Sequence, residues 1–579
     1  MGIYVNPGFE SMESAVSSEI YIDKTGILKI LNKHLGTEKR YFAVSRARRF
    51  GKSMAAGMIE AYYSSGCDSR ALFEPYEIAG DPDFEKHLNK YNVLHFDAAV
   101  FFNAAKNMAD VIHDMDAALL SEMQEEFPYL EEIAPKNTAA AINCVYKREG
   151  RKFIIIIDEY DCIVRDDPDN EGLIKDYLRY LRGFFKTEDS KKFLALGYIT
   201  GILPIKKVNG ESALNNFTEY TMTSPKELMA YFGFTEEEVQ ELCRRYNDDI
   251  KGVREWYDGY YMYEPVKGEI PEDGGPIMND KPWEAYGIRN KQGQYKFPDE
   301  AGGIYDKDGS IHIINGKAMK LCHMYNPNSL VESFMHSEFS SFWKNTGSFD
   351  SLRQFIELNY AGLKDDIVMM LAGGRVAVNI KGFQNDLTHF KKKDDVLTCL
   401  IHMGYLGYDA RTEETFIPNR EVADVFEAAI STGDWDDVAD SLNNSNRLLR
   451  ATLDMDERTV AKVIAESHQD YASIINFHDE NALALAIMVS YYTARKHYYV
   501  KRELPAGRGF ADIAFIPKHE GEYPALIVEL KWNRSAKAAI KQIRDRTYEG
   551  ALSSYKGKML LVGINYTRKS GKYSCRITS

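Results

Sequence analysis

The sequence predicts an α/β protein of several domains, and three observations support this fold class. The chain has 579 residues, which is too long for a single hydrophobic core. Up to about residue 225, short apolar runs alternate with amphipathic helical patterns, which is typical of a doubly wound parallel sheet. Helical patterns dominate the middle of the chain, and strand patterns return near the C-terminus. We therefore expect two α/β domains separated by a helical middle region.

The first domain is predicted to span residues 1–225. Its strand candidates are short apolar runs that are expected to be buried on both faces of a parallel sheet. They lie at residues 40–45, 91–99, 152–161 and 192–202. Between them, "KSMAAGMIEAYYS", "NMADVIHDMDAALLSEM" and "KDYLRYLRGFFK" have the apolar spacing of amphipathic helices.

The middle of the chain is predicted to form two regions. Residues 226–325 are interpreted as a helical lid in which Thr235 and Glu238 form a capping box, followed by a loop insertion with one or two hairpins at 262–320. Residues 326–475 are expected to be helical. Within them, the pattern of residues 394–430 predicts a helix, a hairpin and a second helix, which is the order of a winged-helix-like unit. Such a unit would either have a purely structural role or bind nucleic acid.

The last domain is predicted to span residues 476–579. Its pattern reads α–β–β–α–β, beginning with a long helix over "ENALALAIMVSYYTARKHYY". The strands "GFADIAFI" and "PALIVELKW" follow, then a helix over "SAKAAIKQIRDRTYEGALSSY" and a final strand "KMLLVGINY".

The composition indicates a cytoplasmic protein without a membrane partner. No apolar run approaches the length of about 18 residues that a membrane span requires, and the N-terminus is polar. The seven cysteines are scattered without a CxxC pair, which suits a reducing compartment and argues against structural zinc. A homo-oligomer is compatible with the sequence.

Charge is distributed unevenly along the chain. The net charge is −14, yet residues 491–579 contain 18 Lys and Arg against 7 Asp and Glu. This local excess of 11 positive charges leaves −25 for the remainder. A basic C-terminal region on an acidic body points to a polyanion as its partner, or to an ordinary solvated basic surface.

The stretch "RYFAVSRARRFGKS" has the features of a phosphate-binding loop between a strand and a helix. Lys52 would neutralise phosphate charge and Ser53 would hold magnesium, while the loop backbone and helix start would donate to phosphate oxygens. An arginine, Arg46, replaces the first glycine of the usual pattern, and the arginines of the loop are expected to add positive potential. The candidate nucleotide-binding residues are Arg49, Phe50, Gly51, Lys52, Ser53 and Met54.

Polar side chains at the ends of two later strands complete this prediction. Asp158 would contribute to the magnesium shell, and Glu159 would polarise the attacking water. Thr200, at the end of a further core strand, would face the γ-phosphate. The three positions predict a P-loop NTPase fold that binds ATP and Mg²⁺.

Two strands near the C-terminus carry a second group of candidate catalytic and metal-binding residues. Asp512 lies on one strand, and Glu529 and Lys531 lie two residues apart on the next, so that the latter two share a face. The carboxylates could bind Mg²⁺, and the lysine could orient water or stabilise the charged transition state of phosphodiester cleavage. This pattern predicts a metal-dependent nuclease core.

Three further residues are candidates for the same site. Glu480, at the start of the preceding helix, would complete the metal shell. Gln542 and Tyr548, on the following helix, would assist catalysis or contact the substrate.

Motifs along nearly the whole chain resemble those of bacterial AAA-ATPase-like proteins that carry a C-terminal PD-(D/E)XK nuclease-superfamily domain. They include "YIDKTGIL", "SRARRFGKSMAAGMIEAYYS", "FIIIIDEYDCI", "YNPNSL" and "GFADIAFIP…IVELKW". The resemblance implies a restriction-endonuclease-like C-terminal domain, and it makes the arginine before the phosphate loop a usual family feature. The stretch 262–320 departs from the family by being longer.

The sequence thus predicts an ATP-binding, slowly hydrolysing protein whose Mg²⁺-dependent nuclease domain acts on DNA under nucleotide control. The alternative is a nucleotide-dependent switch or scaffold, in which the nuclease-like domain only binds nucleic acid or a protein partner.

Overall fold

The chain is described here from a computed structural model. The structure describes residues 2–205, 207–208, 211–212, 214–265, 288–289, 295–296, 303–305, 310–314, 317–343, 352–353, 355–356, 360, 362–371, 373–383, 390, 392–432, 436–471, 487–488, 490–506, 509–519, 521–545 and 557–579. They belong to two compact units, Met1–Trp343 with Ala377–Val422, and Lys344–Val376 with Ala423–Ser579. Because the chain passes between these units repeatedly, they do not coincide with the four predicted domain ranges, which stay a prediction.

A five-stranded parallel sheet forms the centre of the N-terminal part of the first unit. Its order is β2-β3-β4-β1-β7. The strands are β1 (Tyr41–Ser45), β2 (Asn92–Asp97), β3 (Phe153–Asp158), β4 (Leu194–Gly201) and β7 (Thr218–Tyr220). This confirms the predicted parallel sheet, and its order inserts β4 between β1 and β3.

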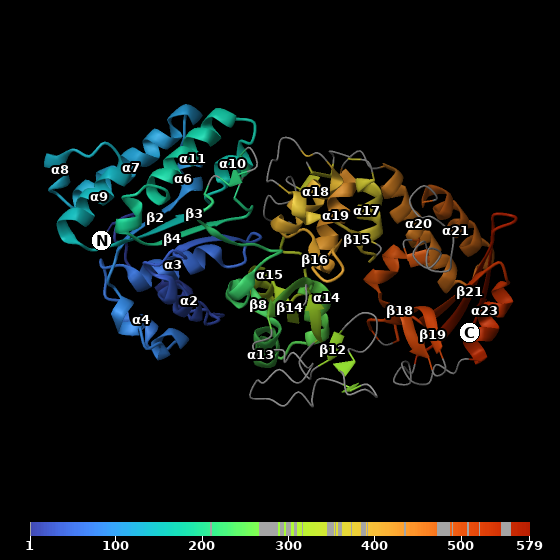
Figure 1. Cartoon of the computed structure of the whole chain (residues 1–579). Helices are drawn as coiled ribbons and strands as arrows, with labels where there is room; N and C mark the ends of the chain where they lie inside the picture. Colours follow the sequence, from blue (N-terminus) through green and yellow to red (C-terminus); the bar gives the residue numbers. More distant parts are fainter. Residues whose placement is uncertain are drawn as a thin grey trace. The chain divides into compact units, whose positions relative to one another are not determined.

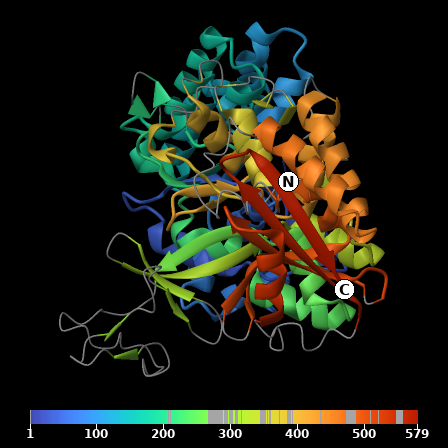
Figure 2. The same cartoon turned by 90° about the vertical axis from the view of Figure 1, so that its right-hand side faces the viewer.

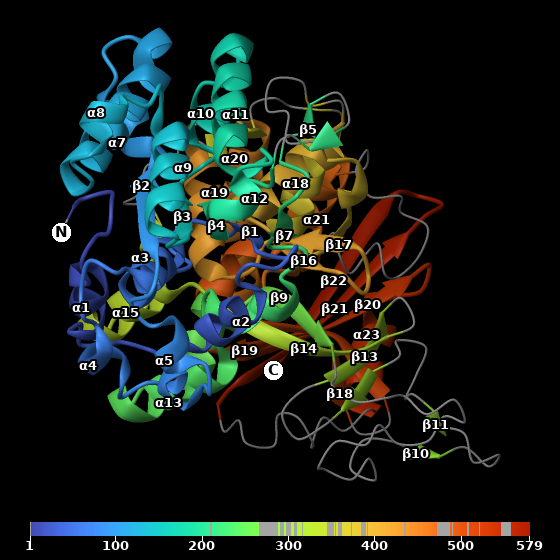
Figure 3. The same ribbon diagram turned by 60° about the vertical axis from the view of Figure 1, so that its left-hand side comes forward.

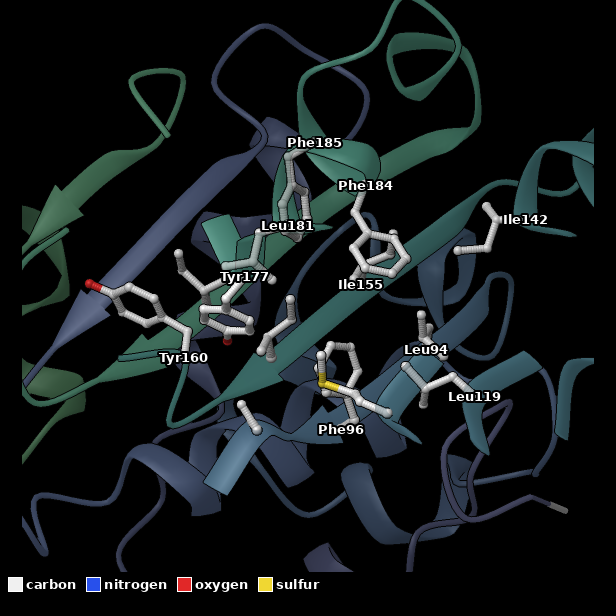
Figure 4. Close-up of a cluster of buried hydrophobic side chains, with 14 of the residues drawn as sticks. Leu94, Phe96, Leu119, Ile142, Ile155, Tyr160, Tyr177, Leu181, Phe184 and Phe185 are labelled. Carbon is white, nitrogen blue, oxygen red and sulfur yellow. The ribbon is translucent and has the colours of Figure 1, made fainter. Parts of the chain in front are cut away.

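Helices cover both faces of this sheet, as Figures 1 and 3 show. One face packs against α7 (Val111–Glu126), α9 (Thr138–Glu149) and α11 (Glu171–Phe185), and the other against α2 (Gly26–His34) and α3 (Lys52–Tyr63). Successive residues of β3 therefore enter different cores, the first of which is drawn in Figure 4. A strand buried on both faces needs an almost continuous apolar run, which explains "FIIII" in β3.

Shorter helices and one small hairpin connect these elements. They are α1 (Glu10–Val16), α4 (Arg70–Phe73), α5 (Phe84–His87), α6 (Ala98–Ala104), α8 (Leu130–Ile133), α10 (Cys162–Asp166), α12 (Ser190–Phe193), β5 (Lys207–Val208) and β6 (Glu211–Ser212).

The first unit continues with helices around a second, antiparallel sheet. Helix α13 (Glu236–Tyr246) begins with the predicted capping box of Thr235 and Glu238. The other elements of this part are α14 (Ile250–Tyr257), α15 (Pro327–His336), β8 (Phe234–Thr235), β9 (Tyr260–Pro265), β12 (Gly303–Tyr305), β13 (Ser310–Ile314) and β14 (Lys317–Tyr325). In addition, β10 (Ile288–Arg289) pairs with β11 (Tyr295–Lys296) in a separate two-stranded sheet. Strands β12, β13 and β14 lie mainly in the stretch 262–320, which was expected to hold one or two hairpins, and β14 also pairs with β9 and β8.

A helix, a hairpin and a second helix complete the first unit. They are α18 (Lys393–Met403), β16 (Gly407–Asp409), β17 (Glu414–Phe416) and α19 (Arg420–Thr432), the last of which continues into the second unit. This is the element order that the sequence predicted for a winged-helix-like unit.

The second unit is built on the mixed sheet β18-β19-β20-β21-β22. Its strands are β18 (Tyr498–Ala506), β19 (Gly509–Pro517), β20 (Ala525–Trp532), β21 (Met559–Thr567) and β22 (Lys572–Thr578), and its helices are α17 (Leu363–Leu371), α20 (Asp436–Leu453), α21 (Glu457–Tyr471) and α23 (Ala536–Asp545). Figure 2 shows α20 and α21 in orange beside the red sheet, and α21 packs against β22. One face of the sheet contributes to a core with α20 and α21, and the other packs against α23.

The predicted α–β–β–α–β order is wrong at both ends. The residues expected to end a long helix form the 3₁₀ turn Tyr492–Lys496 and the strand β18, which pairs with β19 over most of its length. An additional edge strand, β22, pairs with β21. Long cross-strand pairing outweighs the helical pattern of this segment. Among the described helices, none is long and apolar enough to cross a bilayer.

Candidate functional site

The loop between β1 and α3 has the backbone conformation of a tight connection. Gly51 and Arg49 have φ angles of 85° and 67°, in the left-handed region that residues other than glycine seldom adopt. Arg46 has no such φ, so a side chain is tolerated at the position where the usual pattern has glycine. The loop ends at Gly51, directly before the first helical residue, Lys52.

Lys52 points back into this loop. Its Nζ donates to the carbonyl oxygens of Arg46 at 3.2 Å and Ala47 at 3.1 Å, and only 5% of the residue is exposed. Burial lowers the pKa of Lys52, and the nearby carboxylates of Glu159 and Asp158 oppose this shift. The predicted phosphate lysine and the two predicted acidic residues therefore belong to one electrostatic cluster.

Asp158 and Thr200 lie side by side at the carboxyl ends of β3 and β4. The Thr200 hydroxyl donates to Asp158 Oδ1, and the same oxygen accepts from the Glu159 amide at 3.0 Å. Asp158 is 5% exposed and Thr200 is fully buried. Parallel strands bring their carboxyl ends to one edge of the sheet, which is why residues this far apart in sequence meet.

Glu159 is held by an arginine that the sequence analysis did not select. Arg165 Nη1 lies 2.9 Å from Glu159 Oε2 and 3.2 Å from Asp161 Oδ1. Asp161 is 1% exposed, and its other oxygen accepts from the amides of Ile202 at 3.1 Å and Leu203 at 2.8 Å. The i, i+4 spacing of Asp161 and Arg165 on a helix was the available signal.

Asp97 is a further acidic residue at this edge. It is paired in register with Asp158 on the neighbouring strand β2, and it caps α6 by accepting from the Ala99 amide at 2.8 Å. Burial raises the pKa of Asp97, and the charges of Asp158 and Glu159 add to this effect.

The other predicted nucleotide-binding residues have different environments. Ser53 and Met54 are exposed in the first turn of α3, and Arg49 is exposed in the loop. The Phe50 side chain is fully buried in a cluster with Tyr260 and Met324, so only its backbone remains for a ligand.

The Arg46 side chain is buried beneath the loop and is not exposed to a ligand at its surface. Its Nη1 donates to the carbonyl oxygens of Ser45 at 3.0 Å and Tyr220 at 2.9 Å. The guanidinium lies over the Phe232 ring at 5.4 Å, and burial lowers its pKa to about 9. Arg46 therefore braces the base of the loop against β7.

In the second unit, the register of β19 and β20 brings Asp512, Glu529 and Lys531 together. Ile513 pairs with Val528 in an antiparallel ladder, so Asp512 is opposite Glu529. Residues directly opposite each other project from the same face, and Lys531, two residues after Glu529, shares that face. Val528 and Leu530, which alternate with Glu529 and Lys531 along β20, belong to the core on the other face of the sheet. This confirms that successive side chains of β20 point to opposite faces.

Hydrogen bonds link these side chains. Asp512 Oδ2 accepts from the Leu530 amide at 2.6 Å, and Lys531 Nζ lies 3.1 Å from Glu529 Oε1 and 2.7 Å from the Leu530 carbonyl oxygen. Gln542, on α23, donates its amide to Glu529 Oε1. Glu529 is fully buried and Lys531 is 6% exposed.

Two carboxylates on one face, with a lysine beside them, form a donor set that fits a divalent cation. Among the described residues, no cluster of three or more His, Cys, Asp or Glu is arranged to hold a metal. The predicted third ligand, Glu480, and the predicted substrate residue Tyr548 lie outside the described residues.

Two parts of the chain match models of known protein families. Residues 8–209 match the family described as predicted AAA-ATPase, and residues 479–574 match the PD-(D/E)XK nuclease superfamily. The chain joins an AAA-ATPase-like domain to a PD-(D/E)XK nuclease-superfamily domain. Lys52, Asp158 and Thr200 fall in the first match, and Asp512, Glu529, Lys531 and Gln542 fall in the second.

A curated relative is an uncharacterized protein in the vnfD 5′ region of Azotobacter chroococcum mcd 1. It is 25% identical over 256 residues, which cover 42% of this chain and 45% of the relative. The matched part spans less than half of that protein, and the name of that protein assigns no activity.

Proposed function

We propose that this protein binds and slowly hydrolyses ATP in its AAA-ATPase-like domain, and that its PD-(D/E)XK domain cleaves DNA with the help of a divalent metal under nucleotide control. The observation that carries the proposal is the position of Asp512, Glu529 and Lys531 on one face of adjacent strands. The AAA-ATPase-like and nuclease-superfamily matches support the general nucleotide-binding and nuclease-like character.

In the nucleotide site, Lys52 would leave the loop carbonyls and neutralise phosphate charge. Ser53 and Asp158 would hold magnesium, and Thr200 would position Asp158 through their hydrogen bond. Glu159 would orient the attacking water. Because Arg165 holds the Glu159 carboxylate at 2.9 Å, this pair would keep the base aligned until substrate enters.

In the nuclease site, Asp512 and Glu529 would hold the divalent ion. When bound, such an ion supplies Lewis-acid activation of the scissile phosphate. Lys531 would orient the attacking water and offset charge on the transition state, and Gln542 would fix the rotamer of Glu529 through its hydrogen bond. The geometry is compact because all four side chains come from β19, β20 and the following helix α23.

DNA is the proposed substrate because the C-terminal region carries an excess of positive charge. Lys537 and Lys541 are exposed on α23, and among the described residues no carboxylate forms an ion pair with either lysine. A polyanionic backbone is the partner that such a surface fits.

The test incubates the protein with supercoiled, linear and single-stranded DNA, with and without ATP, in Mg²⁺ or Mn²⁺. We expect cleavage that Glu529→Ala abolishes and that Lys52→Ala makes insensitive to ATP. Glu522→Ala, which removes an exposed carboxylate outside the site, is the matched control and should cleave normally.

Two results would contradict the nuclease part: cleavage that persists in Glu529→Ala, or no cleavage by the unaltered protein with any DNA form and either metal. The second result, combined with ATP-dependent DNA binding, would favour the alternative of a nucleotide-dependent switch or scaffold.

A further inference from the structure

Positive charge gathers at one end of the sheet in the second unit. Arg568, Lys569 and Lys572 lie in or beside the turn that joins β21 to β22, and Arg534 follows the neighbouring strand β20. All four residues are exposed, and no carboxylate of the described part of the chain forms an ion pair with any of them. We call these four residues the turn cations. They present uncompensated positive charge to solvent.

Two asparagines hold the turn cations against the end of β20. Asn533 has a left-handed φ of 55°, and its Oδ1 accepts from the Arg568 amide at 2.8 Å. The Asn533 amide donates to the Tyr566 carbonyl oxygen at 2.8 Å. Asn565 is buried, and its Oδ1 accepts from the Arg534 amide at 2.8 Å. The turn is therefore fixed to the β20–α23 connection by hydrogen bonds to backbone amides.

This end of the sheet is also where the predicted nuclease residues lie. Lys531 pairs in register with Asn565 in the parallel ladder of β20 and β21. Asn533, which holds the turn, follows Lys531 by two residues, so their Cα atoms are at most about 7 Å apart. A phosphate backbone bound to the turn cations would therefore lie close to the candidate active site.

A row of aromatic rings crosses the three strands directly below the turn. Trp532 of β20 is in register with Tyr566 of β21, which is in register with Tyr573 of β22. The ring centroids are 4.9 Å apart in both neighbouring pairs, and each of the three residues is partly exposed. Trp532 directly follows Lys531, so the row and the nuclease residues meet at the end of β20.

We propose that the turn cations and the aromatic row bind an unpaired strand of DNA and lead it to the nuclease site. The inference rests on the proposed nuclease function and names the form of its substrate. The turn cations contact phosphates, and Trp532 stacks against a base. Bases in a duplex already stack on one another, whereas unpaired bases leave their faces available to aromatic side chains. Positive charge beside exposed rings is the combination that binds single strands.

The first arm of the test measures binding to a labelled oligonucleotide, single-stranded or annealed to its complement. The full-length protein is used in a chelator, so that binding is recorded without cleavage. We expect the single strand to bind about tenfold more tightly than the duplex. Trp532→Leu should lose about tenfold in affinity for the single strand and little for the duplex, and Trp532→Tyr should retain most of it.

The second arm measures how the affinity for the single strand depends on salt. Arg568→Gln keeps the backbone amide that Asn533 holds but removes one cation. It should weaken binding and reduce the slope of log affinity against log salt by about 0.7. Lys558→Gln is the matched control, because Lys558 is an exposed lysine just before β21, at the opposite end of the strand. It should bind like the unaltered protein, and thermal melting checks that each variant is folded.

The outcomes separate this inference from the proposed function. If no DNA form is cleaved, yet the single strand binds preferentially and Trp532→Leu loses that preference, the binding surface stands and the nuclease proposal is wrong. If Glu529→Ala abolishes cleavage, the nuclease proposal stands. The inference is then overturned by equal binding of single strand and duplex, by unchanged single-strand affinity in Trp532→Leu, or by equal weakening in Lys558→Gln and Arg568→Gln.

Discussion

Lys531 and Glu529 form an ion pair that is almost completely removed from water. Their side chains are 7% and 1% exposed, and their charged atoms lie 3.1 Å apart. A charge buried in this way is tolerated only while its partner remains, because the lost hydration is not otherwise replaced. A divalent ion bound to Glu529 would also compensate the negative charge of this carboxylate. The cost of removing Lys531 should therefore depend on whether the metal is present.

We predict that Lys531→Met destabilises the C-terminal domain by about 3 kcal/mol in the presence of a chelator, because Glu529 loses its cation. Mn²⁺ should restore a large part of this loss, since the ion replaces the missing charge. Hydrogen exchange of the β20 amides measures the local unfolding free energy. Lys537→Met, on the exposed face of α23, serves as the control and should change it little. Equal destabilisation with and without Mn²⁺ would argue against a metal at Glu529.

Glu421 provides a pH-dependent prediction. Its folded-state pKa is raised by burial from 4.5 to about 7, so the folded state favours the protonated carboxyl. Its contribution to stability is therefore fully present below about pH 4.5 and is lost as pH rises through about 7. Glu421→Gln should gain stability relative to the unaltered protein over this range, by about 3 kcal/mol at most. Urea unfolding at pH 5 and pH 8 checks this, and a pH-independent difference would contradict it.

At the scale of elements, helix α23 sets the position of Gln542 over Glu529. The helix packs on β20 and β21 through Ala539 and Ile540. Its close approach depends on Gly563 of β21, where a Cβ would lie 2.5 Å from the carbonyl oxygen of Ala536. A backbone atom cannot move aside as a flexible side chain can, so any larger residue must displace the helix.

We predict that Gly563→Ala lowers domain stability by about 2 kcal/mol and reduces metal-dependent cleavage, because α23 shifts and Gln542 loses its bond to Glu529. Ser574→Ala, on the exposed neighbouring strand β22, should alter neither property. Chemical unfolding and a cleavage assay on the same preparations provide the two measurements. Unchanged cleavage despite lost stability would show that Gln542 is dispensable.

The sequence predicted the elements whose patterns have one physical explanation. The run "FIIII" could only be a strand buried on both faces, and the Glu529–Lys531 spacing fixed a shared face once a strand was assumed. The strand β18 was missed because its residues follow a helical pattern, and pairing with β19 decides its conformation. Glu421 was missed because its partner Phe342 is defined by a tertiary contact, which a local pattern does not contain. Arg165 was missed although the i, i+4 spacing of Asp161 and Arg165 was a local signal.

At the scale of the whole molecule, the first compact unit is not continuous in sequence. It combines residues up to Trp343 with Ala377–Val422, and the second unit contains the segment between them. The AAA-ATPase-like match ends at residue 209, yet Gly233, Asn326 and Gly404 contact the phosphate loop. The loop between β1 and α3 is therefore supported by parts of the chain that follow the family match.

We predict that a protein truncated after residue 225 is poorly soluble and does not bind ATP. Truncation removes the partners of the Phe50 cluster, including Tyr260 and Met324, and exposes its apolar surface. A protein ending at residue 432 keeps these contacts and should bind ATP better. Solubility and binding of a fluorescent ATP analogue compare the two, and tight binding by the shorter protein would show that the later residues are unnecessary.

Under the proposed function, Asp512 and Glu529 share one divalent ion on adjacent strands. Diffraction from crystals soaked in Mn²⁺, recorded at a wavelength where manganese scatters anomalously, tests it most directly. We expect one anomalous peak between these two carboxylates, and we expect it to be lost in Asp512→Asn and in Glu529→Gln. A peak elsewhere in the domain, or carboxylates that remain without manganese at saturating concentration, would contradict it.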